Sequence, residues 1–419
     1  MKLRVFTAFS GYDSQCMALD RLGIDYELVG WSEIDKFAIQ AHNAVYPQWA
    51  DRNYGDISKI DWANVPDFDL FTYSFPCQDI SSAGKQRGLQ KGSETRSSLL
   101  WECQKAIEAK RPKYCLMENV AALVSEKFLP FFLEWERLMC RYGYANYNKV
   151  LNAKDYGIPQ NRERIFMVSV IDPNKAFYWP EPMKLEKRLK DVLEQNVDEK
   201  YYLSDLSINR LLKNLGGKLG EDVNQSEKAI LANCLKIQTF DNYINETGEP
   251  LRIPQATKKG FIEVMTGGLF DMSYPESKTR RGRVQEGGKI SPTLMASGEA
   301  PCYYEGTAKT MCLNSKVNGK QPSLEHRIYD SEGISTAMTT GFHPNIQEPT
   351  FRIRKLTTRE CFRLMGVSES DINKIQQSGV SQSQQYKMAG NSIVVDVLEH
   401  IFRKMFVDTN QESQQLSLF

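Results

Sequence analysis

The chain has 419 residues, of which 41% are hydrophobic and 25% are charged, and this balance indicates a soluble globular protein of two or three domains. The net charge of +1 excludes binding of nucleic acid through overall positive charge, so a nucleic-acid face would have to be a local patch. No apolar run is long enough to span a bilayer, and the first residues lead into a strand pattern and not into a signal peptide.

Cysteine and histidine usage argues against several kinds of site. The nine cysteines are scattered and form no Cys-x-x-Cys pair, so we expect neither a disulfide framework nor a bound metal, and we expect a reducing cytoplasm. The four histidines are His42, His326, His343 and His400. So few histidines give poor support to a Cys-His hydrolase.

The first part of the chain, residues 3–171, alternates short apolar strands with amphipathic helices. Such alternation predicts an α/β fold with a doubly wound, parallel sheet. The expected strands are Leu3–Phe9, Leu28–Glu33, Asp69–Ser74, Tyr114–Glu118, Asn148–Leu151 and Ile165–Ile171. The expected helices include Ser14–Leu22, Lys36–Tyr46, Ser97–Lys110 and Leu129–Tyr142. The pattern ends at Trp179-Pro180-Glu181-Pro182.

The chain then changes character. A charged stretch, expected to be mostly helical, runs to about residue 235, and residues 250–350 are rich in Gly, Pro, Ser and Thr with short strand-like pieces. Inside that segment, 283–291 resembles 327–335. Two copies are too few for a solenoid, so we interpret them as related β modules of one small domain. After 350 the helical pattern returns, and Val394–Phe402 is expected to be a closing helix.

Cys77 is the residue that points most directly to chemistry. It follows an expected strand, Pro76 disfavours helix before it, and open α/β sheets place their sites at the carboxyl ends of strands. A lone cysteine is more often a small buried hydrophobe. Two further polar runs accompany this one, however: Glu118-Asn119-Val120 after another expected strand, and Gln160-Asn161-Arg162-Glu163-Arg164 before a third.

These three runs, in this order, resemble the Pro-Cys-Gln, Glu-Asn-Val and Gln-x-Arg-x-Arg motifs of the cytosine carbon-5 DNA methyltransferases. Further runs resemble other motifs of the family: 9–11, 94–100, 151–160, 354–360 and 385–392. The resemblance extends from about residue 3 to about residue 405. Two departures stand out, because Glu94 stands where the family often has aspartate, and the turn Phe9–Ser14 lacks the second glycine of Phe-x-Gly-x-Gly.

The resemblance implies a Rossmann-like methyltransferase sheet that binds S-adenosylmethionine, with a second, smaller, irregular β-rich domain that recognises the target. The expected parts are a catalytic domain at 1–180 completed by 385–410, a target-recognition domain and hinge at 181–384, and a frayed tail at 411–419. Glu33 would accept from both ribose hydroxyls, and Asp56 from the adenine amino group. The expected cofactor residues are Phe9, Gly11, Glu33, Ile34, Asp56, Ile57, Asn391 and Ser392.

The resemblance also implies the chemistry. The Cys77 thiolate would attack carbon 6 of a flipped-out cytosine, so that carbon 5 can take the methyl group, while Glu118 shares a proton with ring nitrogen 3. Arg162 and Arg164 would hold the base carbonyl and the phosphate, with Arg164 assigned to the base. Because the two arginines are spaced by two on an extended segment, both side chains can point to one side. The loop 81–89 has the composition of a mobile lid.

Double-stranded DNA is the expected partner, and residues 250–350 are expected to choose the target sequence. The expected contacts are Gln78, Ser81, Arg87, Lys278, Arg280, Arg281 and Arg283, although a basic run such as 278–283 is as often only solvated loop. We expect a monomer. The recognition sequence, the target cytosine, a phage origin and a separately acting cognate restriction endonuclease stay open.

Two alternatives also stay open. The same chemistry on RNA is one, and the large Gly- and Ser-rich segment argues against it because it suggests a lobe that reads duplex DNA. A DNA-binding regulator without catalysis is the other, and intact Cys77, Glu118 and Arg164 argue against it.

Overall fold

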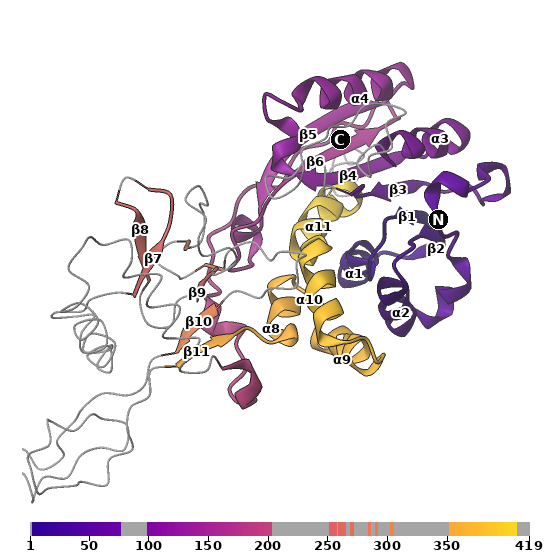
Figure 1. Cartoon of the computed structure of the whole chain (residues 1–419). Coiled ribbons are helices and arrows are strands. Elements are labelled where there is room, and N and C mark those ends of the chain that lie inside the picture. Colours follow the sequence, from indigo (N-terminus) through magenta and orange to yellow (C-terminus); the bar gives the residue numbers. More distant parts are fainter. Residues whose placement is uncertain are drawn as a thin grey trace, which may run out of the picture. The chain divides into compact units, whose positions relative to one another are not determined.

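The computed structural model of the chain describes residues 2–76, 99–202, 251–257, 259–264, 269–271, 284–285, 290–291, 302–305 and 352–408 (Figure 1). The chain divides into two compact units. The main parts of the first unit are Met1–Lys187 and Cys361–Phe419, and the second unit is formed by Arg188–Pro292 and Glu299–Glu360. No helix in the described ranges is long and apolar enough to cross a membrane.

The first unit is built on a six-stranded sheet. All six predicted strands are confirmed, and their spatial order is β2-β1-β3-β4-β6-β5. Their bounds are β1 (Leu3–Ala8), β2 (Tyr26–Ser32), β3 (Leu70–Tyr73), β4 (Tyr114–Val120), β5 (Ala145–Asn152) and β6 (Glu163–Val170). The chain passes from β1 outwards to β2 and then returns to β3, so the strand order reverses next to β1. Open α/β sheets bind their ligands at such a point, beyond the carboxyl ends of the strands.

The predicted all-parallel sheet is wrong for one strand. β2, β1, β3 and β4 run parallel to one another, but β6 pairs antiparallel with both β4 and β5. Only residues 153–162 connect β5 to β6, and they contain a single 3₁₀ turn, Ala153–Tyr156. A parallel pair needs a crossover of about a dozen or more residues, usually a helix, and this connection supplies none.

Helices cover both faces of the sheet. The predicted helices are confirmed as α1 (Ser14–Arg21), α2 (Lys36–Val45), α3 (Leu100–Lys110) and α4 (Leu129–Arg141). Phe6 and Ala8 of β1 face the main hydrophobic core, which α3 and α4 complete with buried side chains such as Trp101 and Trp135. Side chains alternate along a strand, so Thr7 faces the other way and bonds the residue that caps α1.

The chain returns to the first unit within α8 (Thr358–Leu364) and continues there with three further α-helices. They are α9 (Glu369–Gln377), α10 (Gln382–Asn391) and α11 (Val395–Phe402), and the last confirms the predicted closing helix. α11 buries five apolar side chains and packs against α1, while α9 packs against α2. The C-terminal helices thus complete the face of the sheet that α1 and α2 cover (Figure 1).

The described parts of the second unit are β-rich, as predicted. β7 (Leu251–Pro254) pairs antiparallel with β8 (Phe261–Val264), and β10 (Cys302–Glu305) lies between β9 (Leu269–Phe270) and β11 (Arg352–Lys355). The predicted mostly helical stretch is wrong for 181–202, which form only the 3₁₀ turns Leu189–Asp191 and Glu199–Tyr201. Residues 203–235, the second repeat copy at 327–335 and the tail at 411–419 lie outside the described residues.

Candidate active site at the carboxyl edge of the sheet

The register of the parallel strands brings four strand ends to one edge. Ala8 pairs with Ser32 of β2 and with Tyr73 of β3, and Tyr73 pairs with Met117 of β4. Neighbouring strands in a sheet lie about 4.8 Å apart. Glu33, Phe9 and Ser74 follow β2, β1 and β3, and Glu118 lies near the end of β4, so these four residues form a row along the edge.

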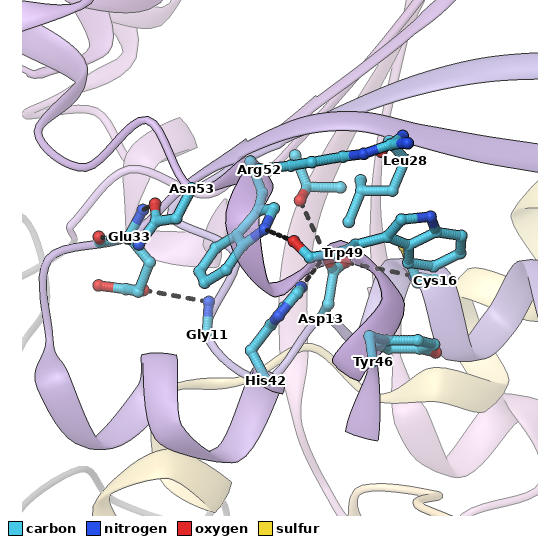
Figure 2. Close-up of polar contacts among 12 residues, drawn as sticks. Gly11, Asp13, Cys16, Leu28, Glu33, His42, Tyr46, Trp49, Arg52 and Asn53 are labelled. Atoms are coloured by element: carbon cyan, nitrogen blue, oxygen red, sulfur yellow. Dashed lines mark hydrogen bonds and ion pairs between the residues drawn. The ribbon is translucent and has the colours of Figure 1, made fainter. Parts of the chain in front are cut away.

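The turn after β1 has an unusual backbone. Phe9, Gly11 and Asp13 all have positive φ angles, of 55°, 60° and 69°. The turn is held to the end of β2 because the Ser10 N–H donates to the Ser32 carbonyl at 3.3 Å and the Gly11 N–H donates to Glu33 Oε2 at 3.1 Å (Figure 2). Glycine tolerates a positive φ angle, whereas other residues adopt one only when their surroundings enforce it.

Glu33 is the most extensively bonded residue of this edge. Its Oε1 accepts from the N–H groups of Ile34 at 2.7 Å and Asp35 at 2.8 Å, in addition to the Gly11 bond on Oε2. Asn53 fixes its main chain, accepting from the Glu33 N–H and donating to the Glu33 carbonyl. A carboxylate can accept about four hydrogen bonds, so Oε2 keeps one position for a further donor.

Asp56 lies beside this strand end because Gly55 is tied to it. The Ser32 hydroxyl donates to the Gly55 carbonyl at 2.6 Å. Asp56 Oδ1 accepts from the Ser58 hydroxyl and N–H, and these bonds lower the pKa of the Asp56 carboxyl. Its Oδ2 has a long ion pair with Lys59 at 3.9 Å. The two apolar residues predicted beside these acids differ in exposure: Ile57 is buried, whereas Ile34 is 71% exposed.

The end of α10 meets the same turn. The hydroxyls of Tyr12 and Ser392 are hydrogen-bonded, and burial raises the pKa of Tyr12 to about 12, so Tyr12 is neutral at ordinary pH. Asn391 is the last residue of α10 and is exposed. Tyr12 directly follows Gly11 in the sequence and is hydrogen-bonded to Ser392, so the predicted cofactor residues from the two ends of the chain lie in one region.

A second group of residues surrounds Glu118 at the end of β4. The Ser74 hydroxyl donates to Glu118 Oε2 at 2.8 Å, and the Arg164 Nε lies 3.1 Å from Oε1. The Glu118 side chain is nearly buried, with 6% of the residue exposed. Asn119 Nδ2 donates to the carbonyl of Phe75 at 2.9 Å. The segment that leads to residue 77 is therefore held against the end of β4.

The two predicted arginines have different partners. Arg164 pairs with Glu118, whereas the buried Arg162 donates through Nη2 to the carbonyls of Gly390 at 2.9 Å and Ser392 at 2.7 Å. Gln160 behaves like Arg162, because its Nε2 donates to the carbonyl of Leu364. Two members of the Gln-x-Arg-x-Arg run thus hold C-terminal segments of the unit, and the predicted role of Arg162 at the base or the phosphate stays a prediction.

Sequence reasoning missed three residues that organise the site: Asn53, Ser74 and Tyr12. Ser74 was signalled weakly by its place at a strand end beside the Pro-Cys motif, and Tyr12 by its place in the first turn. No local signal marks Asn53. Several predicted residues lie outside the described residues, namely Cys77, Gln78, Ser81, Arg87, Lys278, Arg280, Arg281 and Arg283.

Comparisons with known sequences agree over nearly the whole chain. A family model described as C-5 cytosine-specific DNA methylase matches residues 3–407. The type II methyltransferase M2.ScrFI of Lactococcus lactis subsp. cremoris is 32% identical, with 96% of this chain and 99% of that protein covered. The orphan methyltransferase M.SPRI of Bacillus phage SPR is 30% identical, with 99% and 100% covered.

Solved structures support the fold. The Dnmt2 methyltransferase of S. pombe gives a TM-score of 0.56 at 17% identity, covering 98% of this chain and 100% of that one. The methyltransferase EhMeth of Entamoeba histolytica gives 0.57 at 16% identity, covering 98% and 99%. At such identities the likeness concerns the fold alone, and it confirms the predicted Rossmann-like α/β methyltransferase architecture.

Proposed function

Since this chain belongs to the C-5 cytosine-specific DNA methylase family, and is therefore a DNA cytosine methyltransferase, we propose that its reaction takes place along the described sheet edge. The residues after β1 and β2 bind S-adenosylmethionine. The residues after β3 and β4 hold a cytosine that has been flipped out of duplex DNA. The strand register supports this division, because it makes the two groups neighbours on one edge.

The donor residues suit S-adenosylmethionine chemically, and this molecule would supply an electrophilic methyl group. The Glu33 carboxylate has one acceptor position left on Oε2 for a ribose hydroxyl, and a second hydroxyl has to displace a backbone N–H such as that of Gly11. Asp56 Oδ2 can accept from the adenine amino group. The exposed Ile34 would offer an apolar surface to the adenine ring, and Asn391 and Ser392 would hold the donor carboxylate.

Cys77 carries the covalent step of the proposal. Carbon 5 of cytosine is a poor nucleophile until a thiolate adds to carbon 6, and Cys77 directly follows the segment held against β4. As the Cys77 sulfur–carbon bond forms, a proton shared between Glu118 and ring nitrogen 3 neutralises the charge that develops on the ring. After the methyl group has bonded to carbon 5, a water molecule takes the proton from carbon 5. Its electron pair re-forms the 5–6 double bond, and the sulfur–carbon 6 bond breaks to release the Cys77 thiolate and the methylated base.

The Arg164 contacts explain how Glu118 would be oriented for this role. Arg164 uses Nε for Glu118 and Nη1 for the carbonyl of Glu163, and within the described ranges its Nη2 makes no hydrogen bond. That nitrogen is available to the carbonyl oxygen of the base. One guanidinium would then position both the catalytic carboxylate and the substrate, which is a geometry that the planar arginine side chain favours.

We predict that Cys77→Ala abolishes methylation and leaves the fold and donor binding intact, because the thiolate is needed only for attack. The measurement is transfer of a radiolabelled methyl group to duplex DNA, with calorimetry of S-adenosylmethionine as the control for the donor site. Duplex with 5-fluorocytosine at the target should form a covalent adduct with the wild type and not with the variant. Sustained methylation by Cys77→Ala would refute the assignment.

The remaining parts of the proposal concern partners. The family acts on DNA, and we propose that residues 250–350 read the target sequence and that the enzyme works as a monomer. The relatives carry the names of both type II and orphan methyltransferases, so a cognate restriction endonuclease, if present, would act as a separate protein. A DNA substrate and a catalytic thiolate both favour a reducing cytoplasm.

A further inference from the structure

Asp13 occupies a backbone position that ordinarily suits glycine. Its φ of 69° and ψ of 60° are left-handed, and the sequence pattern of the turn departs from Phe-x-Gly-x-Gly at this residue. Among residues with a β-carbon, Asp and Asn adopt this conformation most readily. Even so, a residue with a β-carbon is strained in this conformation, and Phe9 in the same turn also has a positive φ angle. Contacts with the surrounding structure are therefore needed to hold Asp13 in it.

Three different elements surround the Asp13 carboxylate, and two of them donate hydrogen bonds to it. Its Oδ2 accepts from the Thr7 hydroxyl of β1 at 2.9 Å, and its Oδ1 accepts from the Cys16 N–H of α1 at 3.3 Å. His42 of α2 places Nε2 3.4 Å from Oδ2, and both side chains are fully buried. Trp31 of β2 stacks on the His42 ring with centroids 3.8 Å apart. Figure 2 shows Asp13 between Cys16 and His42.

These contacts adjoin the turn after β1, which belongs to the proposed donor site. The Asp13 N–H donates to the Ser10 carbonyl at 2.9 Å, which closes the turn. The closed turn presents the Gly11 N–H to Glu33 and the Tyr12 hydroxyl to Ser392. His42 belongs to the helix whose N-terminal cap, Asp35, directly follows Glu33 and Ile34. The Asp13–His42 contact therefore joins the turn after β1 to the segment after β2.

We propose that Asp13 is a positioning residue for the methyl donor. Its buried carboxylate accepts hydrogen bonds from Thr7 and Cys16 and lies against His42, and these contacts lock a left-handed conformation that glycine would adopt without restraint. The locked turn holds the Gly11 and Tyr12 contacts in the arrangement that receives the donor. The inference rests on the proposed donor site, and it assigns no contact between Asp13 and the donor itself.

The test compares three substitutions at Asp13 by steady-state kinetics and by calorimetry of S-adenosylmethionine. Asp13→Ala loses the anchor and keeps the strain, so the donor KM should rise roughly tenfold or more, as expected when a charged hydrogen-bond network is lost. The kcat and the KM for DNA should stay within about twofold of the wild type, because the base site is untouched. Asp13→Asn should restore most donor affinity, because its amide oxygen can accept from the Cys16 N–H, its amide nitrogen can donate to the Thr7 hydroxyl, and asparagine tolerates positive φ.

Asp13→Gly separates anchoring from conformational freedom. It removes the strain without the anchor, so its donor KM should lie between those of the wild type and Asp13→Ala. A donor KM at the wild-type value in Asp13→Gly would overturn the proposal, because the carboxylate would then be only a tolerated substitute. A loss of kcat in Asp13→Ala without a change in its donor KM would also overturn the proposal. That result would mean that a smaller fraction of the protein is folded.

The controls distinguish this proposal from the donor site on which it rests. Asp20→Ala removes another aspartate of α1, which accepts from Tyr26 and Tyr46, and should leave the donor KM unchanged. If the wild type binds no S-adenosylmethionine, the proposed donor site fails. If the wild type binds it and Asp13→Ala binds it equally well, only the positioning role fails.

Thr7→Val keeps the proposal testable if Asp13→Ala does not fold. This nearly isosteric change removes only the hydroxyl that bonds Asp13 Oδ2. It should raise the donor KM roughly threefold, which is less than Asp13→Ala does because the carboxylate keeps its bond from Cys16, and leave kcat unchanged. An unchanged donor KM in Thr7→Val would count against the role of the network.

Discussion

At the scale of single residues, the carboxylates of the site are already bonded to other groups of the protein. Glu33 accepts from three N–H groups, and Ser74 and Arg164 hold opposite oxygens of Glu118. Such bonds fix a carboxylate before the substrate arrives, so little reorganisation remains during the reaction. The same bonds make these carboxylates costly to remove.

We predict that Glu33→Ala weakens S-adenosylmethionine by about 1–3 kcal/mol, the cost of stranding the partners of a charged group. Calorimetry measures the change. Glu27→Ala is the matched control, because Glu27 lies in β2, the strand that Glu33 follows, pairs with Arg52 and should not affect donor affinity. An unchanged affinity in Glu33→Ala would mean that this acid only caps the strand end.

For Glu118 we predict a loss in the chemical step. Glu118→Gln can still accept from Ser74 but cannot supply the proton for ring nitrogen 3, so the single-turnover rate should fall roughly 10²–10⁴-fold. Donor affinity should be unchanged, which serves as the internal control. A rate within threefold of the wild type would remove Glu118 from the acid role.

At the scale of elements, the residues that enter β6 hold this edge together. Gln160 donates to the end of α8 (Thr358–Leu364), and Arg162 donates to the carbonyls at the end of α10. Because β6 also carries Arg164, these bonds fix the C-terminal segment relative to the base site. Carbonyls at a helix end have no partner within the helix, so a buried guanidinium is a suitable donor for them.

We predict that Arg162→Ala destabilises the protein by about 1.5–3 kcal/mol, because two carbonyls lose a charged donor. The shift of the urea unfolding midpoint measures this cost. Arg403→Ala is the control, since this arginine forms an exposed pair with Glu399 and its loss should cost less than about 0.5 kcal/mol. If Arg162→Ala keeps its stability and loses kcat, Arg162 acts on the base or the phosphate, as the family motif implies.

At the scale of the whole molecule, the chain separates into a unit with the sheet edge and a unit with short antiparallel strands. This division suits a methyltransferase whose chemistry is constant and whose target varies. Phosphate contacts set the register on DNA, whereas contacts with base edges choose the sequence. The proposed reader, residues 250–350, can then vary without disturbing Glu33 or Glu118.

We predict that residues 250–350, grafted onto a related cytosine methyltransferase, transfer the recognition sequence of this protein. Sequencing of methylated cytosines in a host that expresses the chimera gives the result, and the ungrafted relative is the control. An active chimera that keeps its original target would show that the segment is not the reader.

A basic residue such as Arg281 that reads guanine should, when replaced by alanine, relax the specificity at one position of the target by roughly 1–3 kcal/mol.

What the sequence determined by itself was local. Strands and helices follow from the alternation of apolar residues, and all six strands and the four helices predicted before residue 171 occur within a few residues of their expected ends. The order of the short motifs was enough to indicate the family and to propose Glu33, Asp56, Glu118 and Arg164. These features depend only on residues that are close in the sequence, or on the order of short motifs along the chain.

What only the tertiary structure decided depends on residues far apart in the sequence. The antiparallel direction of β6 follows from a connection too short for a crossover. Arg162 meets Gly390 across 228 positions, so no local pattern could separate its role from that of Arg164. Asp13 looked like a missing glycine, and its meaning depends on Thr7 and His42, which reach it from a strand and another helix. Burial and hydrogen bonding are properties of the folded chain, so they appear only when those elements meet.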